Sequence, residues 1–287
     1  MDSLKNSDAT SSCNTRSHPS RIMNNLSMLR KIHWKLRWKL FNKPMVIRRW
    51  HQGLRISLPS SGSAAQIYYR KYSEPHVAEW MVDHLQEGDC FVDIGAHVGE
   101  YSLIAATSIG PAGSIIALEP QHDLCKVIAK NFSDNQINNA RVIHGALGEH
   151  NGRCHLFTDS RTKGAVLDTN SAEADIPMFN LETLLKDVPE NTRIWMKLDA
   201  AGYELPCLTA CKEYLKRRPI HLILKAYHQR EVIQRFPGIS STLAGFLGEM
   251  SYQCLTLKTG SPVRWAGHVE GYCETVICAP HQATTRL

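Results

Sequence analysis

The sequence lacks a long apolar run. No segment approaches the roughly 20 consecutive apolar residues that a membrane-spanning helix needs. Residues 1–30 also lack the shorter apolar run of a secretory signal peptide. These absences predict a cytoplasmic protein with no transmembrane segment.

Metal-binding cysteine patterns are missing as well. The nine cysteines are an odd number, they are scattered, and no pair has the spacing of a zinc finger. Cys207 and Cys211 are four residues apart on an expected helix, which alone is weak evidence for a metal. We therefore expect reduced cysteines and no metal site.

Acidic residues are scarce at the N-terminal end. Residues 1–55 contain 12 Lys and Arg but only two acids, Asp2 and Asp8, for a charge of +10. The net charge of the whole chain is +6, so the remainder is mildly acidic at −4. This distribution argues against a nucleic-acid footprint spread over the folded domain. The basic arm can still contact an anionic surface or an acidic partner.

Length and composition describe one folded domain with an arm. The 287 residues, 43% of them hydrophobic and 21% charged, are enough for a full α/β core. We expect a basic arm over residues 1–60, whose first 20 residues are polar and disordered, and a single domain over residues 61–287.

Residues 31–40 of the arm, KIHWKLRWKL, allow two interpretations. Apolar and basic residues alternate with a period of two, as in a half-buried strand. Leu29, Ile32, Leu36 and Leu40 also fit one face of a helix. The segment is either a membrane- or partner-binding element or an arm packed on the domain. We favour packing, because the helical version has no clean apolar face.

The domain alternates strands and helices in the α/β manner. A helix is expected at 74–85. Residues 151–191 are expected to form an irregular polar loop, either lying over a pocket or solvated at the surface, with one short strand at 155–158. The remaining expected strands lie at 90–94, 114–119, 141–145, 194–199, 220–226, 253–257 and 274–278.

The most informative stretch is FVDIGAHVGEYS at 91–102, followed by IIALEP at 115–120. Asp93 and Glu119 each end an apolar strand, and one helix separates the two strands. Gly95 permits a sharp reversal after the first strand, and Gly99 lets the next helix approach a ligand closely. Nucleotide-like ligands bind at this edge of an open α/β sheet.

These residues suit S-adenosylmethionine. Asp93 is placed to face its ammonium group, directly or through water, and Glu119 can accept hydrogen bonds from both ribose hydroxyls. A dinucleotide pyrophosphate prefers G-x-G-x-x-G, but Ala96 and His97 stand between the glycines here, and the middle glycine is missing. A dinucleotide-dependent oxidoreductase is therefore the less favoured alternative. Four further residues are expected to contact the cofactor: Ala96 in the glycine turn, His97 beside it unless its side chain points outward, Pro120, which follows Glu119, and Ala146, on the adenine ring.

Three residues at the ends of later strands are candidates for catalysis. Asp199 can orient an acceptor hydroxyl, take its proton or help hold a metal, and we favour these roles over the alternative that it caps the next helix. Lys225 can pair with Asp199 or recognise an acidic substrate. His228 can act as a general base, since imidazole titrates near neutrality, but a surface histidine is the simpler interpretation.

Four motifs resemble those of the FkbM family of class I S-adenosylmethionine-dependent methyltransferases. They are VDIGAHVGEYS (92–102), ALEP (117–120), HGALG (144–148) and KLDAAGYELPCL (197–208), and the resemblance extends over about 67–279. It implies a Rossmann-like, seven-stranded, mostly parallel sheet with helices on both faces. It also implies methyl transfer to a hydroxyl of a small molecule, sugar or peptide-like natural product.

Two positions depart from the pattern of that family. Ala201 stands where relatives carry an acid in D-x-E-G, and Lys225 stands near a position where relatives often carry a glutamate. The loss of two carboxylates alters the field of the cleft and the pKa values of its neighbours. A catalytically weak or inactive S-adenosylmethionine-binding module is therefore an alternative to an active enzyme.

Overall fold

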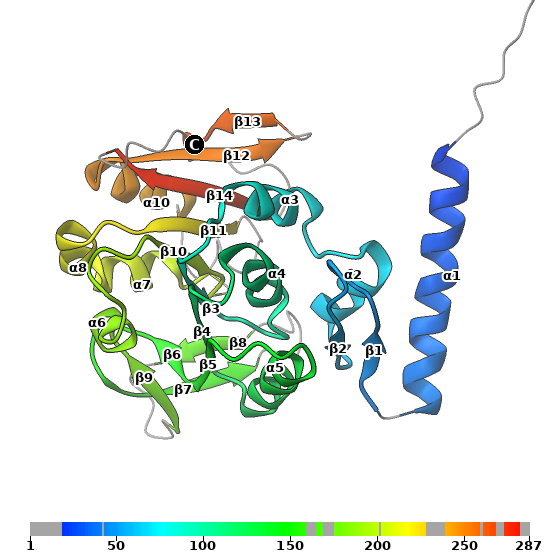
Figure 1. The fold of residues 1–287 in the computed structure, drawn as a ribbon. Helices are drawn as coiled ribbons and strands as arrows, with labels where there is room; N and C mark the ends of the chain where they lie inside the picture. Colours follow the sequence, from blue (N-terminus) through cyan, green and yellow to red (C-terminus); the bar gives the residue numbers. More distant parts are fainter. Residues whose placement is uncertain are drawn as a thin grey trace, which may run out of the picture. The chain divides into compact units, whose positions relative to one another are not determined.

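The computed structural model describes residues 19–41, 43–158, 165–168, 175–200, 202–227, 239–258, 261–267 and 273–281 (Figure 1). The chain divides into two compact units, Met1–Asn42 and Lys43–Leu287. The folded second unit therefore begins before residue 60, where the sequence led us to end the arm.

The first unit contains one long helix, α1 (Pro19–Leu40). Proline is favoured at the first helical position, and Arg37 and Lys39 in the last turn suit the negative end of the helix dipole. Residues 31–40 are therefore helical, and the interpretation of this segment as a strand is wrong. Among the described residues, no helix is both long enough and apolar enough to cross a membrane.

The second unit opens with a small hairpin. Its strands β1 (Met45–Ile47) and β2 (Ile56–Leu58) are antiparallel, and Ile56 and Leu58 are completely buried. Helices α2 (Gly62–Arg70) and α3 (Pro75–His84) follow. The predicted helix at 74–85 corresponds to α3.

The main sheet has the strand order β13-β12-β14-β11-β10-β3-β4-β5. Strands β5, β4, β3, β10 and β11 are parallel, whereas β14 enters antiparallel between β11 and β12. The strands are β3 (Cys90–Ile94), β4 (Ser114–Glu119), β5 (Ala140–His144), β10 (Ile194–Leu198), β11 (His221–Tyr227), β12 (Tyr252–Lys258), β13 (Ser261–Arg264) and β14 (Cys273–Pro280). Apart from the edge strand β13, this is the predicted Rossmann-like, seven-stranded, mostly parallel sheet.

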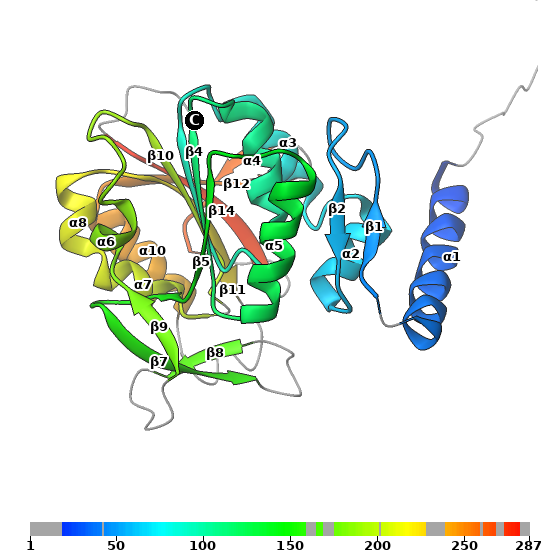
Figure 2. The ribbon, with the colours of Figure 1, turned by 60° about the horizontal axis from the view of Figure 1, so that its bottom comes forward.

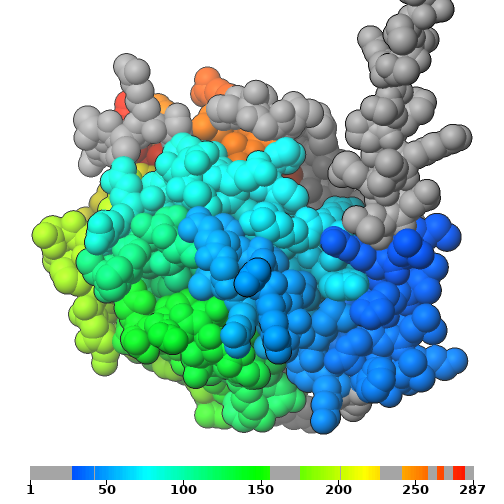
Figure 3. All heavy atoms as spheres, turned by 45° about the vertical axis from the view of Figure 1, so that its right-hand side comes forward, coloured from blue at the N-terminus to red at the C-terminus, as the bar shows by residue number. Residues whose placement is uncertain are grey.

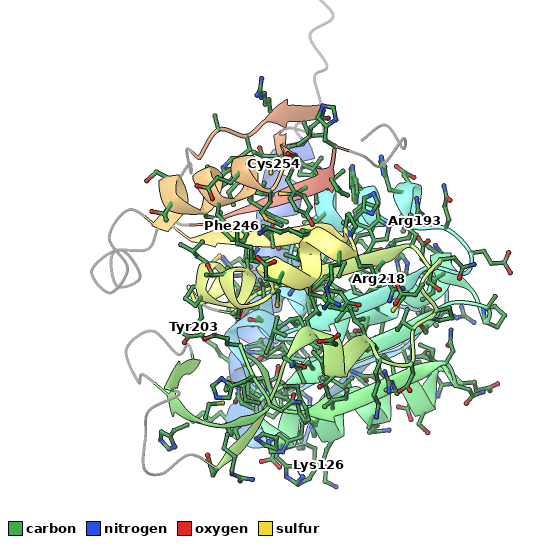
Figure 4. All side chains as sticks on the ribbon, turned by 90° about the vertical axis from the view of Figure 1, so that its left-hand side faces the viewer. Lys126, Arg193, Tyr203, Arg218, Phe246 and Cys254 are labelled. Carbon is green, nitrogen blue, oxygen red and sulfur yellow. The ribbon has the colours of Figure 1, made fainter. Side chains whose placement is uncertain are left out.

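Helices cover both faces of this sheet (Figure 2). One face carries α4 (Glu100–Ile109) and α5 (His122–Asp134), and the other carries α6 (Leu181–Leu185), α7 (Glu204–Ala210), α8 (Lys212–Arg217) and α10 (Ile239–Glu249). Every residue of β3 and β10 is buried, as expected for central parallel strands with both faces covered. Phe246 of α10 and Cys254 of β12 belong to the apolar core on the second face (Figure 4).

A second, four-stranded sheet follows β5, with the order β6-β9-β7-β8. It contains β6 (Ala146–Leu147), β7 (Gly152–Thr158), β8 (Ala165–Asp168) and β9 (Ile176–Phe179). The short strand expected at 155–158 is present within β7. The expectation of an otherwise irregular loop is wrong, because buried apolar residues hold this sheet together: Ala146, Cys154, Ile176 and Met178.

Candidate functional site

The turn between β3 and α4 is built on left-handed backbone. Gly95, His97 and Gly99 have φ angles of +74°, +55° and +77°. The N–H of Gly95 donates to the carbonyl of Leu118 over 2.9 Å. A Cβ at Gly95 would collide with the carbonyl oxygen of Asp199. This position therefore requires glycine both for its conformation and for the close approach of the loop after β10.

Glu119 ends β4 and is tied to this turn. Its Oε2 accepts from the backbone N–H of His97 over 2.8 Å, and its Oε1 accepts from the N–H of Gln121 over 3.0 Å. Burial raises the pKa of Glu119 to about 7, although both backbone amides oppose the shift. Each oxygen uses one lone pair in these bonds, so each keeps capacity to accept another hydrogen bond.

Asp93 is fully buried, and its carboxylate points to protein groups. Its Oδ2 accepts from the backbone N–H of Ser102 over 3.2 Å and from the Ser102 hydroxyl over 2.7 Å. Its Oδ1 lies 3.8 Å from Nζ of Lys197. Burial raises the pKa of Asp93, and Lys197 and Ser102 oppose that shift. Asp93 therefore fixes the start of α4, and its contact with a ligand ammonium, directly or through water, stays a prediction.

Lys197 is a buried cation beneath the site. It is the register partner of Asp93, and its Nζ lies 3.5 Å from Oδ2 of Asp199. The ammonium group also lies 4.7 Å from the ring centroid of Tyr101. Burial alone lowers the pKa of Lys197, but the Asp199 and Asp93 carboxylates outweigh burial and raise this pKa above its usual value. Sequence reasoning gave Lys197 no role, although a lysine in the apolar strand IWMKL was a usable signal.

Asp199 lies directly after β10 at the carboxyl end of the sheet. Its backbone N–H donates to Ile94 over 3.1 Å, and its side chain is 28% exposed. Helix α7 begins at Glu204 with Tyr203 as its N-cap, so the alternative of Asp199 as the helix cap is wrong.

Burial lowers the pKa of His97 to about 4, although the nearby Asp199 carboxylate opposes this shift.

Lys225, on β11, belongs to a cluster of polar side chains that also contains Glu74, Thr275 and Tyr101. Its Nζ forms an ion pair with Glu74 and a 3.3 Å hydrogen bond with Thr275, its register partner on β14. Thr275 and Tyr101 each donate a hydroxyl to Glu74 over 2.6 Å. Burial alone raises the pKa of Glu74, but Lys225 and these hydroxyls hold it below its usual value.

Two ion pairs involve the residues that the sequence singled out. Lys225 pairs with Glu74, and Asp199 pairs with Lys197. The pairing of Lys225 with Asp199, one of two possibilities considered from the sequence, stays a prediction. Thr275 and Tyr101 were not predicted as members of the cluster. Their contacts depend on β14 and α4 lying beside the start of α3, which no local pattern shows.

Glu204 shapes the loop in front of α7. Its Oε1 accepts from the backbone N–H of Ala200 over 2.7 Å and from that of Gly202 over 3.2 Å. Burial, with help from the Asp199 charge, raises the pKa of Glu204 to about 8. The G-Y-E part of the motif therefore holds the backbone that follows Asp199.

The remaining candidates lie in different surroundings. Ala96 is buried, and its N–H donates to Leu118 over 3.2 Å. The carbonyl of Pro120 lies 2.9 Å from Nε2 of His144. Ala146 is buried in β6 beside Met178 of β9. His228 and Ala201 lie outside the described residues. Within the described part of the chain, no group of three or more His, Cys, Asp or Glu could hold a metal ion.

Several solved structures resemble this one at low sequence identity. The precorrin-6y C5,15-methyltransferase of Geobacter metallireducens is 16% identical with a TM-score of 0.40, covering 72% of this chain and 88% of its own. Methyltransferase FkbM of Methylobacillus flagellatus is 15% identical with a TM-score of 0.43, covering 77% of this chain and 56% of its own. TYW2 of P. horikoshii, in complex with MeSAdo, is 11% identical with a TM-score of 0.41, covering 90% and 83%.

Sequence comparison gives a family. No protein with a curated description matches the chain. The family model described as Vibrio cholerae RfbT protein matches residues 40–219, from the last residue of α1 to the loop before β11. This match extends over more than half of the 287 residues, and the chain belongs to the Vibrio cholerae RfbT protein family.

Proposed function

We propose that this protein is an S-adenosylmethionine-dependent methyltransferase that methylates a hydroxyl of a small molecule, sugar or peptide-like natural product. The observation that carries the proposal is the placement of Glu119. Its carboxylate is fixed by two backbone amides at the end of β4, next to the left-handed turn after β3. This is the edge at which open α/β sheets bind nucleotide-like ligands.

The residues at this edge fit the cofactor. The remaining acceptor capacity on the two oxygens of Glu119 matches the two ribose hydroxyls of S-adenosylmethionine. The turn has His97 where a pyrophosphate-binding loop needs its middle glycine, so a dinucleotide fits less well. Ala96 and the backbone of Gly95 and Gly99 would form the floor under the ligand, and Pro120 and Ala146 would border its adenine.

When bound, S-adenosylmethionine supplies a methyl group that is already activated by its sulfonium. The protein then has to align the acceptor oxygen and remove its proton. Asp199 is the residue that we assign to this proton, because its partly exposed carboxylate ends β10 at the cofactor edge. Lys197 holds the Asp199 carboxylate through an ion pair and stabilises the buried Asp93 at the same time.

The acceptor would lie between Asp199 and the Glu74–Lys225 pair. Both members of that pair are only partly buried, and Thr275 and Tyr101 hold the Glu74 carboxylate in place. An ion pair of this kind can hydrogen-bond a polyhydroxylated acceptor through either partner. His228 follows β11 in the sequence and remains a candidate general base. The FkbM type of methyltransferase is part of this proposal, supported by the motif that contains Lys197, Asp199 and Glu204.

A binding module without turnover is the second candidate. The observation that favours it is the 3.5 Å contact between Lys197 and Asp199, because a neighbouring cation weakens a carboxylate as a base. The absence of an acid at Ala201 also favours a binding module over an active enzyme. In this case Ala201→Glu should raise turnover above that of the wild-type chain.

The test is formation of S-adenosylhomocysteine by the full chain with a panel of hydroxyl acceptors, followed by mass spectrometry. We expect product with at least one acceptor, and a loss of about 100-fold or more in Asp199→Asn with little change in cofactor affinity. Lys126→Gln, on the exposed face of α5, is the control and should keep full activity. Cofactor binding by calorimetry without product across the panel would support the binding module and contradict the enzyme.

A further inference from the structure

The exposed large hydrophobic residues of this protein are concentrated in one short segment. Seven such residues are exposed in the part of the chain that the structure describes, and six of them lie within Met28–Phe41. They are Met28, Leu29, Ile32, Leu36, Leu40 and Phe41, with exposed fractions of 45–70%. An exposed apolar cluster of this kind marks an interaction surface.

The sequence alone disfavoured a membrane-binding helix, but the exposed fractions show that four of these residues lie together on one face of α1. Leu29, Ile32, Leu36 and Leu40 are spaced by three, four and four residues, and a helix turns about once every 3.6 residues. They form a continuous row, here called the apolar stripe. In Figure 3 the spheres of residues 28–41, which include this stripe, are dark blue.

Exposed lysines form a second row on α1. Lys31, Lys35 and Lys39 recur every four residues and are all exposed. At about 100° per residue, this row approaches the stripe toward the C-terminal end of α1. The surrounding sequence is also basic, because residues 9–73 contain 13 Lys and Arg and no Asp or Glu. The partner of this surface is therefore anionic and offers an apolar layer next to its charges.

We propose that α1 is an interfacial anchor that binds an anionic lipid bilayer. The apolar stripe would enter the boundary between headgroups and acyl chains, while the lysine stems extend along it and their ammonium groups reach lipid phosphates. A nucleic acid would engage the lysines but leave four aliphatic side chains in water. Because α1 is not apolar enough to span a membrane, it would lie in the plane of the surface.

The test is flotation of the full chain with vesicles. We expect binding to phosphatidylcholine vesicles containing about 30% phosphatidylglycerol, and binding at least about tenfold weaker to pure phosphatidylcholine vesicles. Ile32→Gln with Leu36→Gln should weaken partitioning by about tenfold or more, since two apolar side chains would no longer be buried. Lys31→Gln with Lys35→Gln and Lys39→Gln should weaken it by about 100-fold at low salt.

Two control variants match these changes outside α1. Lys126→Gln with Lys186→Gln and Lys216→Gln removes three exposed lysines of the folded domain. Val46→Gln removes the seventh exposed large hydrophobic residue. Both controls should bind vesicles like the wild-type chain. Glutamine has good helix propensity, so circular dichroism should be unchanged in the α1 variants.

Three results would overturn the proposal. The first is no flotation with anionic vesicles, and the second is equal binding to neutral and anionic vesicles. The third is wild-type binding by the variant of the apolar stripe together with release from the vesicles by duplex DNA, which would show a purely electrostatic arm for polyanions. All residues of the candidate site lie in the second unit, so methyl transfer to a water-soluble acceptor is measured separately from vesicle binding.

Discussion

The backbone N–H of His97 donates to Oε2 of Glu119 over 2.8 Å, although the two residues are 22 positions apart in the chain. His97 takes a left-handed conformation in doing so, with φ of +55°. The bond joins the turn after β3 to the end of β4. The glycine turn and the second acid of the motif therefore act as one unit at the cofactor edge.

Removal of the Glu119 carboxylate should weaken cofactor binding. For Glu119→Ala we expect a loss of about 1–3 kcal/mol, or about 5- to 150-fold in Kd, because charged hydrogen bonds to the ribose hydroxyls disappear. Calorimetric titration with S-adenosylhomocysteine measures this directly. Gln121→Ala is the control, since it keeps the backbone amide that Glu119 accepts. A Kd for Glu119→Ala equal to that of the wild type would exclude Glu119 from the site.

Cofactor affinity should depend on pH near neutrality. Burial raises the pKa of Glu119 to about 7, and only the ionised carboxylate accepts strong hydrogen bonds through both oxygens. The Kd should therefore fall as the pH rises from about 6 to about 8. The same titration with Glu119→Gln should show a flatter pH profile. Affinity that falls as the pH rises would contradict this assignment.

Stability of the ligand-free protein should fall as the pH rises above neutrality. Burial raises the pKa of Glu100 and of Glu119 to about 7 and that of Glu204 to about 8, from an ordinary value of 4.5. At pH values between the ordinary pKa and the raised pKa of these groups, the folded state binds more protons than the unfolded state. The free energy of unfolding therefore decreases as the pH rises. Below about pH 6.5 the low pKa of His97 opposes this trend, so the clean window is pH 6.5–8.5.

Thermal unfolding across that window measures the effect. Tm should decline from pH 6.5 to 8.5 in the wild-type chain. Glu204→Gln should decline less steeply, since it removes the group with the highest of the three pKa values. A Tm that rises with pH over this range would show that the three carboxyl groups are already ionised in the folded protein.

Lys197 should matter more for stability than any surface lysine. Lys197→Met leaves Asp93 buried beside no cation, and we expect a loss of about 3–5 kcal/mol in the free energy of unfolding. The double variant with Asp93→Asn should recover part of it. Lys126→Met, which breaks an exposed pair with Asp123, should cost less than about 1 kcal/mol. Equal effects at Lys197 and Lys126 in urea unfolding would refute a buried ion pair.

Gly95 should tolerate no side chain. A Cβ there meets the carbonyl oxygen of Asp199, so Gly95→Ala should destabilise the fold by about 2–4 kcal/mol through strain and overpacking. Gly88→Ala is a matched control, because Gly88 has φ of +86° but open space around it. Gly88→Ala should lower the free energy of unfolding by only about 1–2 kcal/mol, from conformational strain alone. Similar losses for both variants in urea unfolding would mean that the loops after β3 and β10 are not in close contact.

Local sequence patterns predicted the central strands of this protein well. Apolar runs between turn residues located β3, β4, β5, β10 and β11 within a residue or two, since central parallel strands are apolar throughout. The D-I-G and L-E-P motifs also predicted that Asp93 and Glu119 lie at one edge of the sheet. Both inferences need only strand ends and glycine conformations, which are local properties.

Side-chain partners were predicted poorly because they depend on tertiary contacts. The direction of the Asp93 carboxylate is set by Ser102 and by Lys197 on a neighbouring strand. The pair of Glu74 and Lys225 joins α3 to β11 across 151 positions of sequence. Apart from the strand expected at 155–158, the small sheet that contains β7 and β9 was missed, because its strands are short and polar segments such as 159–164 separate them in the sequence.

The most direct test of the central claim is a crystal structure of this chain with S-adenosylhomocysteine. We predict ligand density at the carboxyl ends of β3 and β4, with both ribose hydroxyls hydrogen-bonded to Glu119 and the homocysteine sulfur directed toward Asp199. Density elsewhere, or a ribose turned away from Glu119, would contradict the account.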